Sequence, residues 1–455
     1  MRSINKRRLA ALVTASAVSL VLVACSATPD TSEPDSVKGQ TIKVLISSGH
    51  KQFTPVLDRI GEFEAATGIT VELDPVGTVD IEGAIIRDMT LGGCTYDNVE
   101  ILDGAMPVAS QYMSDLGKFL EKDGTSTKEL LAGQAGWTEK AMTFDGALKY
   151  YPFYSGAKGI AYRVDLFEDP ANKAAFQDKY GYALPLPPKT MAQLDDLAEF
   201  FTKDGMYGIV FSGVGDSAET TLADVVFRSG VAGYQDEKGN SLWGPKHPEN
   251  QAVVAKAANW LTGLVDKGYA PTDVRAMQTG ESTSYYTDGK AAMIYDHIYL
   301  PWAQFSADNV TSVIGETKSF EPPSFKEGAG GMTFFWGRAI PECSKHKAAS
   351  WEFMKWIQSE EMLKLALTEG TGVFVPTDLD LLKWSVDQGV LPSGVADAVE
   401  HSPGYTITIA TGRIRQAANL PLVEKVMQGE LSGAEYAETS GERIQKEARA
   451  FGLVK

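Results

Sequence analysis

Hydrophobic and polar residues alternate between Ile42 and Ile46, which predicts a first β-strand that ends in the small polar segment 47–50. Thr54 and Pro55 follow, with the residue types of a helix N-cap and a first helical turn, and Gly68 is typical of a helix end. The chain therefore begins its folded part with a strand followed by a helix.

The same order of elements continues. The pattern predicts a strand at 69–73, an amphipathic helix at 81–91 and a strand at 99–101 that runs into the segment 102–104. Strands that alternate with helices predict an open α/β sheet, in which ligands bind beyond the carboxyl ends of the strands. We therefore expect the segments 47–50 and 102–104 to border a ligand site.

The second half of the chain is richer in helices. No repeat of 20 to 50 residues is present, which argues against a solenoid. The predicted elements are a strand at 159–163, a helix that Thr190 caps, helices at 252–266 and 351–367, and a mostly helical stretch from 396 to 451 that the β-branched run 406–409 interrupts.

The N-terminus has the form of an export signal, because four basic residues precede the uncharged run 9–24. The tetrapeptide 22–25 resembles the lipobox of bacterial lipoproteins, in which the cysteine carries a diacylglycerol. We therefore expect a signal peptide at 1–24, lipidation at Cys25 and a flexible tether at 25–37. The alternative is an ordinary signal peptide with an incidental cysteine.

Length and charge narrow the function classes. Without its first 25 residues the 455-residue chain keeps 430, more than a single core usually holds, so at least two lobes are expected. Loss of the four basic residues of the signal changes the formal charge from −17 to −21. Such a charge disfavours nucleic acid and anionic lipid as partners.

Two cysteines remain after Cys25, namely Cys94 and Cys343. Disulfides persist outside the cytoplasm, so the two residues could form a bond. Two separate buried cysteines are the alternative, and the sequence leaves both open.

Several segments resemble, in content and in order, the carbohydrate class of bacterial extracellular solute-binding proteins. The most specific succession is Gly-Lys-Ala-Ala-Met before a strand, then Gly-Gly, then Ile-Pro-Glu-Cys-Ser-Lys and a tryptophan-bearing helix. The matching segments are 42–68, 103–104, 145–163, 187–190, 286–293, 330–341 and 344–353.

The resemblance implies a periplasmic-binding-protein-like α/β fold with two lobes, each with a central β-sheet flanked by helices, joined by a three-segment hinge. It places lobe 1 at 38–141 and 328–379, and lobe 2 at 142–327 and 380–455. Cys94 and Cys343 would then share a lobe, which makes a disulfide geometrically conceivable.

The resemblance also implies the chemistry of the site. A sugar has an apolar C–H face and a rim of hydroxyls, so its receptor needs flat aromatic rings and carboxylates or hydroxyls. The residues near the expected cleft with these properties are Trp302, Trp336, Tyr154, Tyr299 and Tyr405 as stacking platforms, and Asp103, Asp296, Ser48, Ser155 and His50 as polar partners.

The expected function is a non-catalytic, monomeric receptor of an ABC importer, on the outer face of the cell membrane, that clamps a carbohydrate and delivers it to a permease. We expect no cofactor or metal, because the sequence has no phosphate-loop or zinc-protease motif and only five histidines, and no nucleic acid, because of the negative charge. Receptors for polyamines or betaine are the nearest alternatives. A secreted glycosidase and a structural surface protein are the more distant ones.

Overall fold

The computed structural model describes residues 36–77, 80–298, 317–326, 330–370, 374–392, 394–402 and 404–455. Residues 36–455 form one compact unit. The expected signal peptide, Cys25, Tyr299 and Trp302 lie outside the described residues. Among the residues described, no helix is both long enough and apolar enough to span a bilayer.

The strands carry most of the framework. Their bounds are β1 (Thr41–Ser47), β2 (Thr70–Val76), β3 (Asn98–Leu102), β4 (Thr143–Phe144), β5 (Ala147–Leu148), β6 (Tyr151–Arg163), β7 (Tyr207–Phe211), β8 (Ala291–His297), β9 (Thr317–Phe320), β10 (Thr333–Ala339) and β11 (Val375–Pro376).

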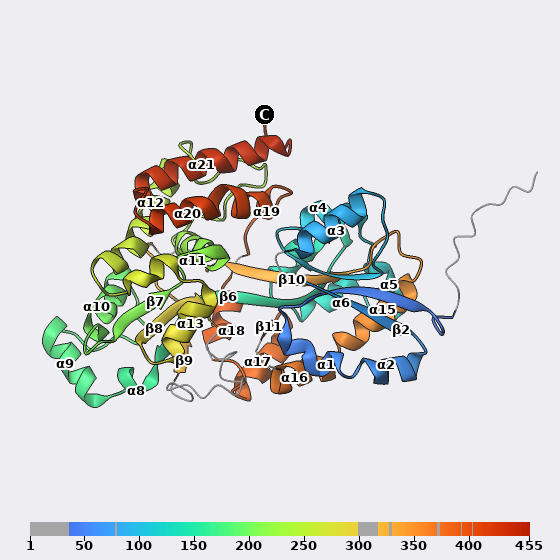
Figure 1. The fold of residues 1–455 in the computed structure, drawn as a ribbon, viewed down its shortest axis with the longest axis horizontal. Helices are drawn as coiled ribbons and strands as arrows, with labels where there is room; N and C mark the ends of the chain where they lie inside the picture. The colour runs from blue at the N-terminus through green and yellow to red at the C-terminus, as the bar shows by residue number, and fades with distance from the viewer. Residues whose placement is uncertain are drawn as a thin grey trace, which may run out of the picture. The chain divides into compact units, whose positions relative to one another are not determined.

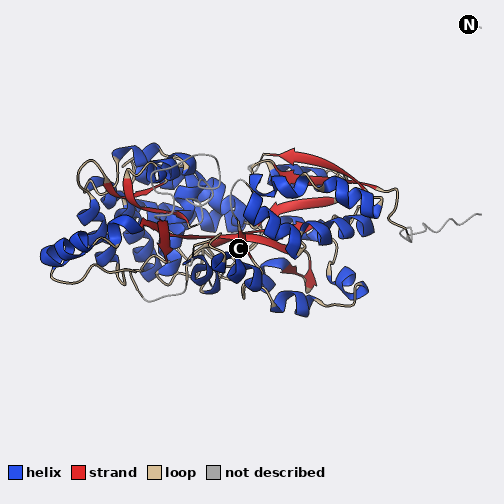
Figure 2. Ribbon diagram, turned by 90° about the horizontal axis from the view of Figure 1, so that it is seen from below, coloured by secondary structure: helices blue, strands red, loops and turns tan. Residues whose placement is uncertain are grey.

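Helices surround these strands in both halves of the folded unit (Figures 1 and 2). They are α1 (Thr54–Leu57), α2 (Ile60–Thr67), α3 (Ile81–Thr90), α4 (Met106–Ala109), α5 (Gly117–Lys122), α6 (Thr127–Ala132), α7 (Thr138–Met142), α8 (Val164–Phe167), α9 (Pro170–Tyr180), α10 (Met191–Phe201), α11 (Gly215–Arg228), α12 (Pro248–Asp266), α13 (Thr279–Thr287), α15 (Lys347–Ile357), α16 (Glu360–Glu369), α17 (Leu379–Asp387), α18 (Gly394–Glu400), α19 (Thr411–Arg413), α20 (Leu420–Met427) and α21 (Gly433–Ala450). The π-helix η4 (Ile414–Asn419) joins α19 to α20.

The sheet order is β2-β1-β3-β10-β6-β8-β7, with β9 and β11 also paired to β6. Strands β2, β1 and β3 run parallel, as the alternation of strands and helices predicts. The long strand β6 pairs with β10 and β11 through its first half and with β8 and β9 through its second half. One strand thus connects the sheets of the two lobes, as Figure 1 shows.

Two separate clusters of buried hydrophobic side chains lie on either side of this connection. The first core draws on 42–157, Ile298 and 335–399. The second core draws on 160–295, 405–444 and two further residues, Phe320 and Met332. Apart from Ile298, which joins the first core from the segment after β8, the chain passes between the cores inside β6, between Met332 and β10, and before Tyr405. From here on, the first lobe means the residues around the first core, and the second lobe means those around the second core. The lobe boundaries given by the sequence remain predictions.

Two local predictions were wrong. Thr54 is the first residue of α1 and not its N-cap, and the helix breaks at 58–59 before α2 begins. The predicted helix 351–367 is two helices, because the side chain of Ser359 accepts a hydrogen bond from Met362 N and caps a new helix. A continuous hydrophobic stripe hid this break. The cap at Thr190 is present, since its side chain accepts from Gln193 N at 3.2 Å.

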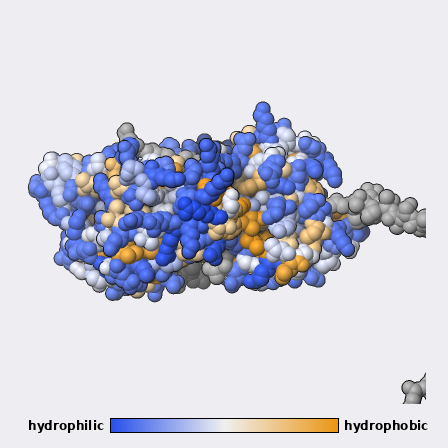
Figure 3. Space-filling view, turned by 90° about the horizontal axis from the view of Figure 1, so that it is seen from above, coloured by the Kyte–Doolittle hydropathy of each residue, from blue (hydrophilic) through white to orange (hydrophobic). Residues whose placement is uncertain are grey.

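A disulfide joins Cys94 and Cys343, with 5.9 Å between their Cα atoms. Cys94 precedes β3 and Cys343 follows β10, and these two strands pair antiparallel. The face shown in Figure 3 is dominated by hydrophilic residues, with hydrophobic ones gathered mainly toward the middle.

Candidate functional site

Asp103 lies directly after β3, at the carboxyl end where ligand loops are expected, and its side chain is fully buried. Its carboxylate accepts a hydrogen bond from Tyr405 Oη at 2.8 Å and another from Gly104 N at 2.6 Å. The guanidinium of Arg415 lies 3.3 Å away. Asp103 belongs to the first lobe, whereas Tyr405 and Arg415 belong to the second, so these contacts bridge the two cores.

Arg415 is surrounded by carboxylates. Its Nη2 donates to both oxygens of Asp216, at 2.9 and 3.1 Å, and its Nε lies 3.5 Å from Glu219. The side chains of Arg415 and Glu219 are buried, at 4% and 1% exposure. A charged group removed from water this fully needs such partners to remain ionised. The guanidinium is therefore fixed between the lobes.

Burial controls the protonation of this cluster. Burial raises the pKa of Asp103 although Arg415 and the Tyr405 hydroxyl lower it. Burial also raises the pKa of Glu219, to about 7, against the attraction of Arg415. The pKa of Glu82 is raised by burial and by the negative charge of Asp103. The cluster therefore contains more carboxylate groups than the single positive charge of Arg415 can neutralise.

The backbones of the two lobes approach closely beside this cluster. A Cβ placed on Gly412 would lie 3.0 Å from Glu82 Oε1 and 3.1 Å from the carbonyl oxygen of Gly104. A Cβ placed on Gly104 would in turn lie 3.3 Å from the Cα of Gly412. Glycine at both positions therefore permits the contact between lobes.

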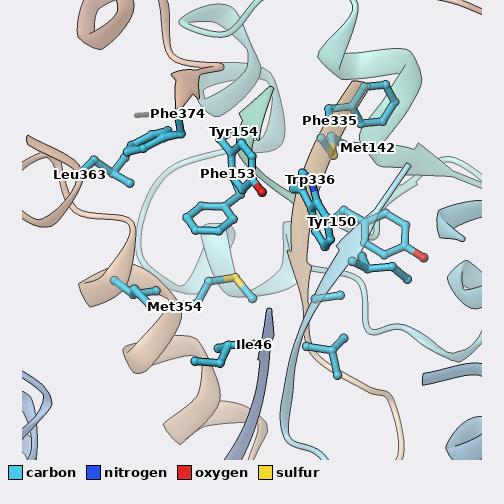
Figure 4. Packing of buried hydrophobic residues seen from close by; sticks show 14 of the residues in the cluster. Ile46, Met142, Tyr150, Phe153, Tyr154, Phe335, Trp336, Met354, Leu363 and Phe374 are labelled. Carbon is cyan, nitrogen blue, oxygen red and sulfur yellow. The ribbon is translucent and has the colours of Figure 1, made fainter. Parts of the chain in front are cut away.

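His50, Tyr154 and Trp336 meet inside the first lobe. One ring nitrogen of His50 contacts the hydroxyl of Tyr154 and the other contacts the carboxylate of Glu100. Tyr154 and Trp336 stack with ring centroids 6.0 Å apart and an interplanar angle of 15°. Figure 4 shows Tyr154 between Phe374 and Trp336. The pairing of β10 with β6 brings these two rings together, because Trp336 lies opposite Tyr154 in that pair.

Two buried charged residues, Glu100 and Arg338, lie close to His50 and Phe153. Arg338 donates to Glu100 Oε2 at 3.3 Å and to Asn98 Oδ1 at 3.2 Å. Burial alone would raise the pKa of Glu100, but His50 and Arg338 hold it below its usual value. Trp336 and Tyr154 are each 3% exposed, so they present little surface to solvent in this conformation.

Asp296 is the centre of a second buried network, in the second lobe. Its carboxylate contacts Lys158 Nζ at 2.9 Å and Ser212 Oγ at 2.8 Å, and it also contacts Ser217. Burial opposes ionisation, but Lys158 and the other partners hold the pKa of Asp296 well below its usual range. Both carboxylate oxygens are already paired with protein side chains. In this conformation Asp296 therefore has a structural role in the interior of the second lobe.

The other predicted residues are placed as follows. Ser48 is exposed in the loop after β1, whereas Ser155 is fully buried and its hydroxyl lies 3.4 Å from the carbonyl oxygen of Val375. The structure brings Asp103 and Tyr405 together, and separately His50, Tyr154 and Trp336. A ligand role for any of the ten remains a prediction.

A sequence profile of bacterial extracellular solute-binding proteins matches residues 47–364. That is more than half of the chain. The protein belongs to this family.

Solved structures support the same fold for this solute-binding protein. The maltose-bound MalE3 of T. maritima matches with a TM-score of 0.70 and 15% identity, over 90% of this chain and 99% of that one. The sugar-binding protein MalE of Xanthomonas citri gives 0.71 and 16%, over 91% and 98%. An ABC transporter solute-binding protein of Agrobacterium radiobacter in complex with ribitol gives 0.65 and 21%, over 90% and 99%.

Residues that sequence reasoning missed contribute to the junction between the lobes of this solute-binding protein. Trp137 and Phe335 stack at 4.8 Å and, with Tyr405, line a cavity of about 250 Å³. Among the described residues, Trp137 Nε1 has no hydrogen-bond partner. No pattern in the sequence distinguishes Trp137 from the other tryptophans of the chain. Arg415 lies two residues after Arg413, and nothing in the sequence distinguishes these two arginines.

Proposed function

We propose that this protein is the substrate-binding lipoprotein of an ABC importer and that it captures a sugar between its two lobes. The observation that carries the proposal is the bridge from Asp103 to Tyr405 and Arg415, because a buried contact between lobes requires them to be closed. The relatives in solved structures include proteins described with maltose and with ribitol, which supports a polyhydroxylated solute.

Binding follows from the exchange between open and closed forms. A solute that touches both lobes stabilises the closed form by its differential affinity for it. Carboxylates accept hydroxyl hydrogen bonds, and the aromatic rings of Trp137, Tyr405 and the predicted Trp302 suit the C–H face of a sugar ring. The role is binding and delivery, not catalysis.

The proposed anchor is a diacylglycerol on Cys25, with the segment up to Val37 as a tether. The anchor would keep the monomeric receptor on the outer face of the cell membrane and raise its effective concentration near the permease. The permease would recognise the closed pair of lobes. Mass spectrometry of the protein from its native membrane tests the modification at Cys25 directly.

Isothermal titration against a panel of mono- and oligosaccharides, sugar alcohols, polyamines and betaine tests the ligand class. We expect saturable binding to a saccharide or sugar alcohol, together with a smaller radius of gyration in solution scattering. Binding to cations and to no polyol would overturn the sugar assignment, and steady hydrolysis of an oligosaccharide would overturn the receptor role.

A further inference from the structure

A cavity of about 560 Å³ lies in the first lobe, away from the junction between the lobes. Its walls come from β6, α6, the α15–α16 corner and α17, and Phe153 and Leu363 among its lining residues appear in Figure 4. It shares no lining residue with the cavity at Trp137 and Tyr405. Small-ligand sites commonly have about 300 to 1,000 Å³, so the volume suits a mono- or disaccharide.

Two glutamines in this cavity carry unused hydrogen-bonding capacity. Gln358 is 9% exposed, and neither its amide nitrogen nor its amide oxygen has a partner among the described residues. Gln134 donates to Asp378 at 3.3 Å, but its own oxygen has no partner within the described part of the chain. Both side chains line the cavity, and a buried polar group without a partner is costly, so a ligand that hydrogen-bonded to these atoms would relieve that cost.

The unpaired atoms include a donor and acceptors together. A cation supplies donors alone and would leave the amide nitrogen of Gln358 unpaired, whereas a hydroxyl donates and accepts. The protein also already provides a cation here, because Lys364 Nζ lies 4.7 Å above the ring of Trp384 and pairs with Glu360 at 2.5 Å. The unpaired amide groups favour a neutral polyol, and spermidine tests the alternative of a polyamine, because the lining also includes four carboxylates, those of Glu129, Glu360, Asp378 and Asp380.

The remaining residues that line the cavity also suit a polyol ligand. Tyr151, Phe153 and Trp384 supply aromatic rings, and Asp378 and Asp380 supply carboxylates. Carbohydrate receptors combine an apolar aromatic wall with polar groups at the rim of the ring. Asp378 already accepts from Leu381 N at 2.8 Å and caps α17, which fixes its position.

We propose that this cavity is a second polyol site, lined by Gln134, Gln358, Tyr151 and Trp384, which binds a small saccharide or sugar alcohol within the first lobe. Since every described residue that lines the cavity belongs to that lobe, binding there does not require the lobes to close. The site therefore differs from the proposed capture site, and the two can succeed or fail separately.

The test uses Gln358→Leu, which removes the unpaired donor and acceptor and leaves an apolar side chain of roughly similar volume. Gln388→Leu is the matched control, because it makes the same change on an exposed glutamine just after α17 that does not line the cavity. The probes are D-mannitol, maltose and spermidine. The readout is the indole N–H resonance of Trp384, assigned with Trp384→Phe.

We expect D-mannitol or maltose to shift the Trp384 resonance saturably, and Gln358→Leu to weaken this response by about tenfold or more. Gln388→Leu should leave it unchanged, and Asp103→Ala should weaken binding between the lobes without affecting it. Circular dichroism should show Gln358→Leu folded, since it removes unpaired buried atoms. No saturable shift with either polyol, a response to spermidine alone, or an unchanged response in Gln358→Leu would overturn the second site.

Discussion

The hydroxyl of Tyr405 donates a 2.8 Å hydrogen bond to the carboxylate of Asp103, across the junction of two lobes whose cores are otherwise separate. The two residues are far apart in sequence, and each is rigidly held in its own lobe. Asp103 follows β3, and Tyr405 packs its ring against Phe227 and Tyr234. The presence of this hydrogen bond therefore indicates directly that the two lobes are closed.

Tyr405→Phe removes this bond and keeps the packing of the ring. A hydrogen bond to a charged group contributes about 1.5 to 3 kcal/mol, so we expect the solute affinity to fall about 10- to 100-fold. Isothermal titration with the solute found in the panel measures this loss. Tyr269→Phe is the control, because its hydroxyl donates to Glu199 at 3.1 Å within the second lobe alone. Equal losses in both variants would contradict a role in closure.

Glu219 should make stability depend on pH. Its pKa is about 7 in the folded protein, compared with 4.5 for an ordinary glutamate, because burial penalises its charge. The folded state therefore binds the proton more tightly, and this contribution to stability is lost as the pH rises from about 4.5 to 7, by about 1.4 kcal/mol for each pKa unit.

Urea unfolding across this pH range, in the wild type and in Glu219→Gln, checks the prediction. Glutamine cannot ionise and can keep hydrogen bonds to Tyr234 and Asn419. The stability of the variant relative to the wild type should therefore rise with pH. Parallel pH profiles would show that Glu219 does not titrate in this window.

The sequence predicted the helices and strands better than it predicted the contacts between them. The alternation around Val44 and the cap at Thr190 are local signals, and the structure confirms both elements. The break before Ser359 was missed because the hydrophobic stripe continues across it. The roles of Trp137 and Arg415 depend on the partner lobe, which local periodicity does not encode.

Gly412→Ala should weaken solute binding while the open form remains stable. The new Cβ would lie 3.0 Å from Glu82 Oε1 and 3.1 Å from the carbonyl oxygen of Gly104, atoms that face it when the lobes close. Overpacking of this kind costs about 1 to 2 kcal/mol, a factor of about 5 to 30 in affinity.

Gly263→Ala is the matched control, because Gly263 lies within α12 and a Cβ there meets no atom within 4 Å. It should leave affinity unchanged and stabilise α12 by about 0.5 to 1 kcal/mol. Solution scattering of the unliganded variants adds a second measurement, in which Gly412→Ala should show the larger radius of gyration. Wild-type affinity in Gly412→Ala would mean that the backbones do not approach in the bound form.

The disulfide between Cys94 and Cys343 should support stability and leave solute binding unchanged. It closes a loop with a sequence separation of 249, so its loss should lower the free energy of unfolding by about 2 to 4 kcal/mol. It joins the start of β3 to the end of β10, because Val99 pairs with Ala339 there, whereas Asp103 follows the opposite end of β3. The double variant Cys94→Ser, Cys343→Ser should therefore unfold at lower urea concentration and still bind solute with the wild-type affinity. A large loss of affinity in a folded double variant would show that the disulfide positions Asp103 through β3.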